Sequence, residues 1–394
     1  MHASTKRMRI SILPLMILIA AVSLISFNRI PISSVFADGP NVVDFTGYAH
    51  YTFNNLHNPT GLAVANGNLY IADTGNNVIK MFNPSLGTLS VLAGSGTAGY
   101  NDGSPASAQF NTPTGLSAVY TAQDIQSGPG FPPTRLRLIE IRINDTGNNA
   151  IRRMCIQAPG DQVTCQSVNG LPNGQVVTMG GGSLGDADGN GSASRFNSPT
   201  GFATDGLLIG DTGNNSIRTM DANNNAGTLI ASQVPGFIDG NLSVARFSYP
   251  TVALATPIGT LIVDSGNHAI RLLNGANQVT TLAGNGTAGY ADGQGNSARF
   301  NKPTQVVYNS GDGAYYIADT FNNCIRRMDS AGNVTTYAGI GGQSGLVDGA
   351  STSAKFDKPT GIAIANGYLY VADSGNNAIR RVDMNANIVS TYIN

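Results

Sequence analysis

The sequence contains no tryptophan, three cysteines and four histidines, and only 11% of its residues are charged. Glu140 is the single glutamate. The cysteines form no Cys-x-x-Cys pair and no Cys/His spacing typical of a zinc site. A phosphate-binding glycine loop, a Ser-x-x-Lys pair and a G-x-S-x-G nucleophile motif are also absent. Because few Glu and His residues are available for acid–base chemistry, the sequence does not favour an enzyme.

Residues 1–37 differ from the rest of the chain. Basic residues precede an apolar run over 10–27, and Val35-Phe36-Ala37 places small residues before a cleavage position. We expect 1–37 to be a secretory signal peptide. The alternative is an uncleaved N-terminal anchor, although Pro14 interrupts the apolar run. The domain over 38–394 is then expected to be secreted, periplasmic or extracellular.

The charge balance bears on the class of partner. Without residues 1–37, the chain has 18 basic and 23 acidic residues and a net charge of −5. Binding to nucleic acid depends on an excess of Lys and Arg that displaces counterions from phosphates, so no nucleic-acid partner is expected. Membrane contact is expected only if the N-terminal segment stays uncleaved. We expect a monomer that binds a protein or a small polar or anionic ligand.

One phrase occurs six times along the chain. It consists of Pro-Thr, a strand, and then Asp-[Ser/Thr]-x-Asn-[Asn/His]-x-Ile-[Lys/Arg]. The copies begin at Pro59, Pro113, Pro199, Pro250, Pro303 and Pro359. Short β-branched and aromatic runs, divided by Gly, Asn and Pro, fill each copy without a sustained helical period. Such units bury their apolar faces only by stacking, so we predict an all-β six-bladed β-propeller of four-stranded antiparallel blades.

Asp and a basic residue seven positions later recur together in every copy. These pairs are Asp73/Lys80, Asp145/Arg152, Asp211/Arg218, Asp264/Arg271, Asp319/Arg326 and Asp373/Arg380. Six equivalent catalytic aspartates in one chain are implausible, so we predict a structural role, as a repeated ion pair or as a basic side-chain stem packed between blades. In the sixth copy, Asp373 is expected to accept N–H groups of the turn that follows it, and Gly375 is expected to supply a positive φ.

These phrases resemble the NHL repeat family, through N-x-P-x-G, L-Y-[IV]-A-D-[ST]-G-N-N and the following I-R. The resemblance covers residues 58–394 and implies a six-bladed propeller. Related propellers include metal-dependent lactonases and zinc-dependent amidating lyases, but on the innermost strands of copies one, two, three and six only Asp205 offers a ligand. The segment 186–191 matches the first half of a calcium loop, but Asn197 stands at its twelfth position. We therefore predict no cofactor, with calcium as the alternative.

Blade two departs from the repeat by two insertions, at 120–140 and 155–174. Because the loops after the first and third strands of a blade emerge on one face, we expect the insertions to form a single lobe. Its candidate interaction residues are Arg135, Arg137, Glu140 and Arg142. Long insertions on a rigid scaffold are often binding loops, and the alternative is a tolerated surface insertion.

The cysteines divide into two kinds. Cys155 and Cys165 flank a short turn in the second insertion, and an exported chain favours a disulfide between them over two free thiols. Cys324 stands where the other copies carry Val, Ala or Ser. We therefore expect Cys324 to be a buried, inert thiol.

The residues around the first Pro of each copy also vary. The innermost strands begin at this point, so these residues are expected to face the mouth of the central channel. The predicted ligand-binding residues are His57, Asn58, Tyr249, Lys302, Gln305, Asp357 and Lys358. Such a set suits a small anionic or sugar-like ligand, and the alternative is a solvated rim.

Together these patterns predict a secreted, non-enzymatic binding or scaffold propeller for a protein or small ligand. One alternative is a lactonase-like hydrolase or lyase at the channel mouth, with His57 as base and Lys302 and Lys358 as anion stabilisers. Another is an extracellular adhesin for a cell-wall polymer.

Overall fold

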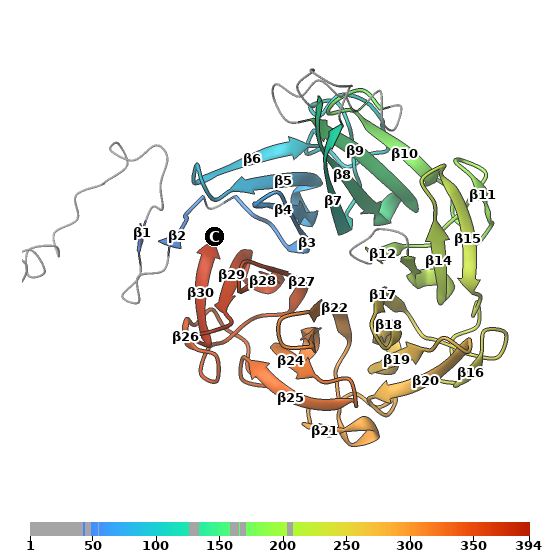
Figure 1. Ribbon diagram of the computed structural model, residues 1–394, viewed down its shortest axis with the longest axis vertical. Helices are drawn as coiled ribbons and strands as arrows, with labels where there is room; N and C mark the ends of the chain where they lie inside the picture. Colours follow the sequence, from blue (N-terminus) through green and yellow to red (C-terminus); the bar gives the residue numbers. More distant parts are fainter. Residues whose placement is uncertain are drawn as a thin grey trace, which may run out of the picture. The chain divides into compact units, whose positions relative to one another are not determined.

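The computed structural model describes residues 42–43, 49–53, 55–125, 134–157, 165, 171–202 and 208–394. The predicted signal peptide lies outside the described residues. Residues 40–394 form one unit, in which six β-sheet blades surround a central axis (Figure 1). The predicted fold class is confirmed. Within the described part of the chain, no helix has the length and apolar character needed to span a membrane.

Each blade is an antiparallel sheet whose strands follow one another outward from the axis. Blade one contains β3 (Pro59–Ala65), β4 (Asn68–Asp73), β5 (Val78–Asn83) and β6 (Thr88–Ala93). Blade two contains β7 (Pro113–Ile125), β8 (Thr134–Asp145), β9 (Ala150–Gln157) and β10 (Val176–Gly181). Blade three contains β12 (Pro199–Phe202), β13 (Leu208–Asp211), β14 (Ser216–Met220) and β15 (Asn225–Ile230).

The last three blades repeat the same arrangement. Blade four contains β17 (Pro250–Thr256), β18 (Gly259–Asp264), β19 (Ala269–Leu273) and β20 (Gln278–Ala283). Blade five contains β22 (Pro303–Asn309), β23 (Ala314–Asp319), β24 (Cys324–Met328) and β25 (Asn333–Ala338). Blade six contains β27 (Pro359–Ala365), β28 (Tyr368–Asp373), β29 (Ala378–Asp383) and β30 (Ile388–Ile393).

Blades three to six each gain a two-residue fifth strand on the outer edge. These strands are β11 (Gly189–Asn190), β16 (Gly240–Asn241), β21 (Gly293–Gln294) and β26 (Gly349–Ala350). They come from the Asp-Gly loops that connect one blade to the next. The prediction of four strands per blade therefore holds for blades one and two, and it omits a short edge strand elsewhere.

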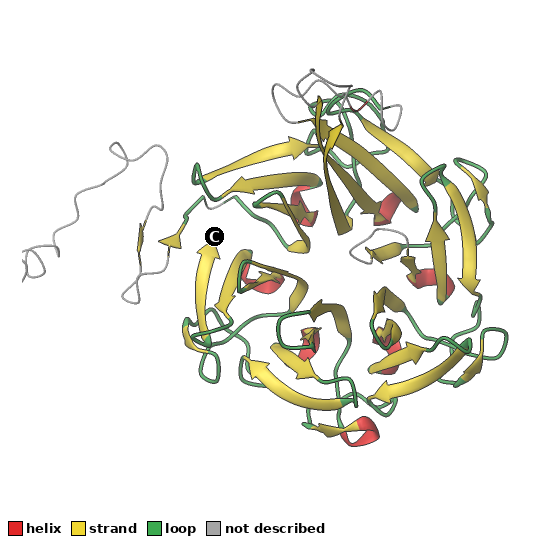
Figure 2. Ribbon diagram, viewed as in Figure 1, coloured by secondary structure: helices red, strands yellow, loops and turns green. Residues whose placement is uncertain are grey.

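A single 3-10 turn follows the second strand of every blade (Figure 2). All six turns lie on one face of the ring, because each starts beside the Pro that opens the innermost strand of its blade. The turns are η1 (Thr74–Asn76), η2 (Thr146–Asn148), η3 (Thr212–Asn214), η4 (Ser265–Asn267), η6 (Thr320–Asn322) and η7 (Ser374–Asn376), and η5 (Gly295–Ser297) lies in the loop before blade five. We call the face with the six post-strand turns the turn face.

The role predicted for Gly375 is wrong. The left-handed residue is the one that follows each turn, such as Asn377 with φ of 53°. A Cβ on Gly375 would instead lie 2.5 Å from Cγ of Asp357, so glycine is required here by close packing. Blade five is the exception, because Phe321 occupies the equivalent position.

The N-terminal segment closes the ring against the C-terminal strand. The backbone N–H of Tyr51 donates to the Tyr392 carbonyl at 2.8 Å, and that of Phe53 donates to the Asn394 carbonyl at 2.7 Å. The Tyr51 ring lies 4.7 Å from that of Phe82 in blade one and 5.6 Å from that of Tyr392 in blade six. β30 is thus the fourth strand of blade six, and residues 51–53 lie outside it. The two-stranded pair β1 (Val42–Val43) and β2 (Ala49–His50) precedes this segment.

Candidate functional site

The six Asp–basic pairs join the second and third strands inside each blade. Their N–O distances are 2.7 to 3.0 Å, and both side chains of each pair are almost fully buried. The predicted ion pairs are therefore confirmed. The predicted bonds from backbone N–H groups of the following turn to Asp373 are wrong. Oδ1 of Asp373 instead accepts the N–H of Asp357, two residues before Pro359, at 2.7 Å, and Oδ2 accepts the side-chain amide of Asn376 at 2.8 Å.

Five of these basic residues are arginines that also bind a second aspartate. The second carboxylates come from the Asp-Gly loops, at N–O distances of 2.6 to 2.8 Å, in Asp102, Asp188, Asp239, Asp292 and Asp348. Each guanidinium lies over a phenylalanine ring at 4.9 to 5.3 Å. In blade one, which lacks an Asp-Gly loop, Lys80 binds the Asn55 carbonyl instead, at 2.5 Å. Lysine therefore replaces arginine in the blade that has no Asp-Gly loop to supply a second carboxylate.

Burial raises the pKa of Asp211, Asp264 and Asp319 to about 6, although hydrogen bonds and the paired arginines act in the opposite direction. A raised carboxylate pKa often marks a functional site. In this ring the same environment recurs in consecutive blades, and none of the three carboxylates lines a cavity of the central channel. The three carboxylates with raised pKa values therefore have a structural role in their blades.

The residue before each Pro is held in a left-handed conformation, with φ between 47° and 50°. Its N–H donates to the side chain that follows the preceding blade's turn. Lys358 donates in this way to Oδ1 of Asn323 at 2.9 Å, and Lys302 donates to Nδ1 of His268 at 2.9 Å. Burial, and next the charge of Lys302, lower the pKa of His268, which keeps Nδ1 free to accept. This linkage fixes where the pre-proline side chains leave the turn face.

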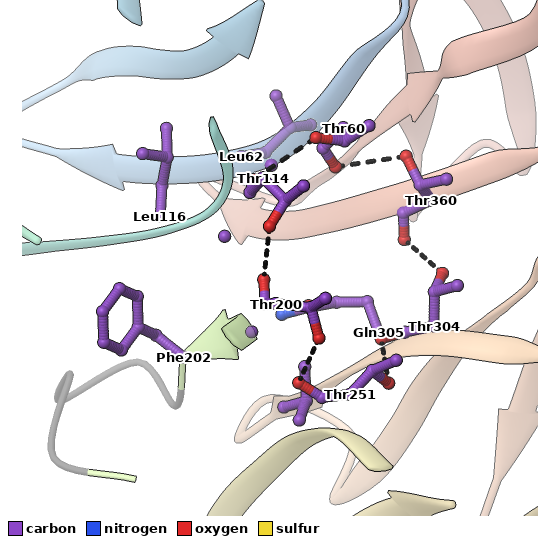
Figure 3. Close-up of a pocket in the computed structure, with 14 residues that line it drawn as sticks. Thr60, Leu62, Thr114, Leu116, Thr200, Phe202, Thr251, Thr304, Gln305 and Thr360 are labelled. Carbon is purple, nitrogen blue, oxygen red and sulfur yellow. Dashed lines mark hydrogen bonds between the residues drawn. The ribbon is translucent and has the colours of Figure 1, made fainter. Parts of the chain in front are cut away.

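A ring of six threonines forms the channel wall next to the turn face (Figure 3). The Oγ1 of each lies 2.8 to 3.4 Å from the backbone carbonyl of the next, from Thr60 through Thr114, Thr200, Thr251, Thr304 and Thr360 back to Thr60. These bonds cross every blade boundary. The threonine hydroxyls therefore close the ring from inside and are largely committed to the protein.

Two consecutive cavities occupy the channel. The first, of about 180 Å³, adjoins the threonine ring, and the second, of about 260 Å³, lies deeper. They share Leu62, Leu116, Phe202 and Gln305. Among the described residues, no charged side chain lines either cavity.

The seven predicted ligand-binding residues separate into two groups. Gln305 lines both cavities. The other six, on the turn face, line neither: Asp357 is half-buried, and His57, Asn58, Tyr249, Lys302 and Lys358 are exposed. The described residues therefore do not bring His57 and the two lysines into one enclosed site.

Part of the turn face carries exposed aromatic and basic side chains. The Lys302 ammonium lies 5.3 Å from the centroid of the Phe321 ring, and Phe321 is 49% exposed. Lys358 is bonded to Asn323, two residues after Phe321, and Tyr249 of blade four is 59% exposed. We call Tyr249, Lys302, Phe321 and Lys358 the aromatic-basic arc. Sequence reasoning missed Phe321, although its replacement of a turn glycine was the signal.

The blade-two insertions lengthen the strands of that blade. β7 has 13 residues and β8 has 12, against four to seven for their equivalents. Glu140 accepts a hydrogen bond from Nε of Arg142 at 2.8 Å, and Arg142 is largely buried. The side chains of Arg135 and Arg137 lie outside those the structure describes. Half of the predicted lobe residues therefore form an internal ion pair.

The predicted disulfide is confirmed between Cys155 and Cys165, whose Cα atoms are 5.8 Å apart. Cys324 is a free, fully buried thiol, as expected, and burial raises its pKa above the ordinary range. The two kinds of cysteine therefore differ in both bonding and reactivity.

Alkylation before and after unfolding counts these thiols. We expect iodoacetamide to label no cysteine in the native protein, because Cys155 and Cys165 are bonded and Cys324 is buried. Denaturant without reductant exposes one thiol, and denaturant with reductant exposes three. Intact-protein mass spectrometry measures each step, and three labels without reductant contradict the disulfide.

The calcium-like segment at 186–191 is hydrogen-bonded to the outer strands of blade three. Oδ1 of Asp188 binds Arg218 at 2.8 Å and the Thr228 hydroxyl at 2.7 Å, and Asn190 donates to the Asn223 carbonyl. Asp205 lies outside the described residues. Among the residues that are described, no three His, Cys, Asp or Glu side chains gather in a metal-binding cluster.

Comparison with known proteins identifies the repeat. The NHL repeat model matches residues 56–82 and 356–381, which lie in blades one and six. "NHL repeat-containing protein 2" of Bos taurus is 36% identical over 107 residues, covering 26% of this chain and 15% of that protein. "Protein SUPPRESSOR OF QUENCHING 1, chloroplastic" of Arabidopsis thaliana is 38% identical over 96 residues, covering 24% of this chain and 9% of that protein. The match thus spans a small part of these relatives' length.

A solved structure supports the fold at greater coverage. An auxiliary nutrient binding protein from Bacteroides thetaiotaomicron superposes with a TM-score of 0.52 over 85% of this chain and 69% of that chain. The sequence identity is 15%, so the likeness concerns the fold alone.

Proposed function

This chain belongs to the NHL repeat family, and on that basis we propose that it is a binding propeller whose aromatic-basic arc takes an acidic surface of a partner protein. The observation that carries the proposal is Phe321, an exposed aromatic ring that lies beneath Lys302 where the other blades have a turn glycine. Frame residues recur in all blades, whereas this ring has no structural counterpart.

The arc makes the turn face asymmetric. Blades four to six present Tyr249, Lys302 and Lys358 before their prolines, whereas blades one to three present Asn58, Thr112 and Ser198. Exposed aromatic side chains supply large contact area at interfaces and are enriched among the residues that dominate binding energy. A partner is therefore expected to contact one half of the ring.

Charge sets the chemistry of that partner. The ammonium groups of Lys302 and Lys358 are exposed, with Asp357 as the adjacent carboxylate. Opposite charge across an interface guides association and excludes like-charged partners. An acidic partner surface with an apolar or aromatic contact for Phe321 satisfies both features.

Binding of poly-L-glutamate, measured by fluorescence anisotropy, tests this proposal. We expect the wild-type protein to bind at low salt and the affinity to fall as salt screens the lysines. The variant Lys302→Gln/Lys358→Gln is expected to weaken binding about tenfold, since each rim charge contributes roughly 0.5–1 kcal/mol. Phe321→Gly should weaken binding of a Glu-Tyr copolymer more than that of poly-L-glutamate.

Arg327→Gln provides the matched control, because Arg327 pairs with Asp312 in the loop between β22 and β23, at the end of the blade opposite the turn face. It is expected to bind as the wild type does. If the wild type and the double lysine variant bound poly-L-glutamate with equal affinity, the aromatic-basic arc would not be the binding surface. Selective binding of polygalacturonate over poly-L-glutamate would favour the adhesin alternative.

The blade-two lobe is the second candidate surface, because its elongated hairpin and its disulfide distinguish it from every other blade. A variant lacking residues 121–134 tests it in the same assay. The enzymatic alternative receives less support from the geometry, because the described cavity walls contain no carboxylate or imidazole side chain.

We also propose that the protein works outside the cytoplasm. The Cys155–Cys165 disulfide supports this, because structural disulfides persist mainly in oxidising compartments. The charge and apolar pattern of residues 1–37 supports export by the same reasoning. Detection of the mature chain in a periplasmic or culture fraction, starting near Asp38, checks this location.

A further inference from the structure

We propose that the channel cavities form a second site, separate from the arc, for a small neutral carboxamide or lactam held by Gln305. The first cavity, of about 180 Å³, is comparable with the apolar cavities of about 150 Å³ that hold benzene in other proteins. The second cavity extends the space by about 260 Å³. A molecule with one benzene-sized ring and a polar substituent therefore fits the channel.

The wall of the first cavity is mostly apolar, whereas that of the second, which includes Ser117 and Tyr308, is mixed. Leu62, Leu116 and Phe202 line both cavities, and Val252 lines the first. The hydroxyls of the threonine ring already lie within hydrogen-bond distance of the next blade's carbonyls. They are thus poor partners for a ligand. The body of the ligand is expected to be apolar and uncharged, because burying an unpaired charge here would be costly.

Gln305 is the polar side chain that departs from the repeat. Its equivalents are glycine in four blades and Val252 in blade four, and Gly61, for example, is required because a Cβ there would lie 1.9 Å from the Thr114 carbonyl oxygen. Figure 3 shows the Gln305 side chain reaching across the opening toward Thr200. A primary amide presents one acceptor and two donors, so it pairs best with a ligand that also offers both. This pairing selects a carboxamide or lactam.

A second amide, on the opposite side of the ring, also indicates a polar occupant near the first cavity. Asn144 of blade two is fully buried, and neither its Oδ1 nor its Nδ2 has a hydrogen-bond partner. A Cβ on Gly115, which lines the first cavity, would lie 2.5 Å from that Nδ2. Buried polar atoms without partners indicate a polar occupant nearby, such as a ligand group or a water that it holds. Asn144 itself lines neither cavity, but its amide lies directly behind Gly115, across the ring from Gln305.

Three small probes test the site on the full chain by NMR titration: benzamide, toluene and benzoate. We expect benzamide to bind, and benzoate to bind at least about tenfold more weakly because the described part of the channel wall offers its charge no counterion. Gln305→Leu should weaken benzamide binding about three- to tenfold, the value of one net hydrogen bond, while toluene binding stays unchanged. Gln305→Val, which copies blade four, is a second variant with the same expected result.

Three outcomes overturn the assignment. The first is that both Gln305 variants bind benzamide as tightly as the wild type, and the second is that neither benzamide nor toluene binds to the wild type. The third is tighter binding of benzoate than of benzamide, which would refute a neutral ligand. The Lys302→Gln/Lys358→Gln variant should keep its benzamide affinity. A failure of the arc proposal and a failure of the channel proposal are therefore distinguishable.

Discussion

Replacing Arg326 with Met is expected to lower the free energy of unfolding by about 3–5 kcal/mol, the cost of breaking a buried ion pair from one side. The guanidinium binds Asp319 at 2.8 Å and Asp292 at 2.7 Å, and it donates to the Arg299 and Ala291 carbonyls. Removing it leaves the Asp319 carboxylate buried without its counterion. Equilibrium denaturation in urea measures the loss.

The next residue in the chain supplies the control. Arg327 pairs with Asp312 at 3.3 Å, and both side chains are more than one-third exposed. Because water and salt screen such a pair, Arg327→Met should cost at most about 1 kcal/mol. Similar losses for Arg326→Met and Arg327→Met would contradict the structural role assigned to the recurring arginine.

Replacing Tyr51 with Ala is expected to cost about 3 kcal/mol or more, the usual range for removing a buried aromatic side chain. Tyr51 is 4% exposed, and its ring contacts Phe82 of blade one and Tyr392 of blade six. The change removes two of the aromatic contacts between the first and last blades and leaves the Phe82–Tyr392 contact, at 5.3 Å, without the ring that packs on both. We also expect faster proteolysis at the N-terminal end of blade one, because closure of the ring is weakened there.

Tyr249→Ala serves as the comparison, since Tyr249 is 59% exposed and should contribute less than about 0.5 kcal/mol to stability. Denaturation midpoints and limited proteolysis of the two variants provide the measurement. An unchanged midpoint in Tyr51→Ala would show that the ring closes without this contact.

The fold could be predicted because the strand and turn residues of a blade recur in each of the six copies. Asp and a basic residue seven positions apart also predicted the ion pair, since the two positions lie on the same face of neighbouring strands, two residues apart in register. The second carboxylate was missed, although the sequence contains its signal: the five copies with an Asp-Gly loop have Arg, and blade one has Lys80. That association becomes informative only when the loop is known to return to the arginine.

Other features depend on tertiary contacts that the repeat does not encode. Gly375 looked like a residue chosen for backbone freedom, but the side chain of Asp357 in front of it sets the requirement. The closing segment at 51–53 is too short to give a strand pattern. The predicted ligand-binding set mixed Gln305, which enters the channel, with pre-proline residues whose left-handed backbone directs them to the surface. These residues are close together in the sequence, but Gln305 faces the channel and the pre-proline side chains face the solvent.

The central claim is that recurring residues hold the ring together and divergent residues bind. Parallel measurement of denaturation midpoint and poly-L-glutamate affinity in Arg326→Met and Lys302→Gln/Lys358→Gln tests it most directly. We predict that Arg326→Met lowers the midpoint but, under conditions where it is folded, keeps the affinity. The lysine variant should keep the midpoint and lose about tenfold in affinity. Loss of both properties in both variants, or of stability alone in the lysine variant, would contradict this account.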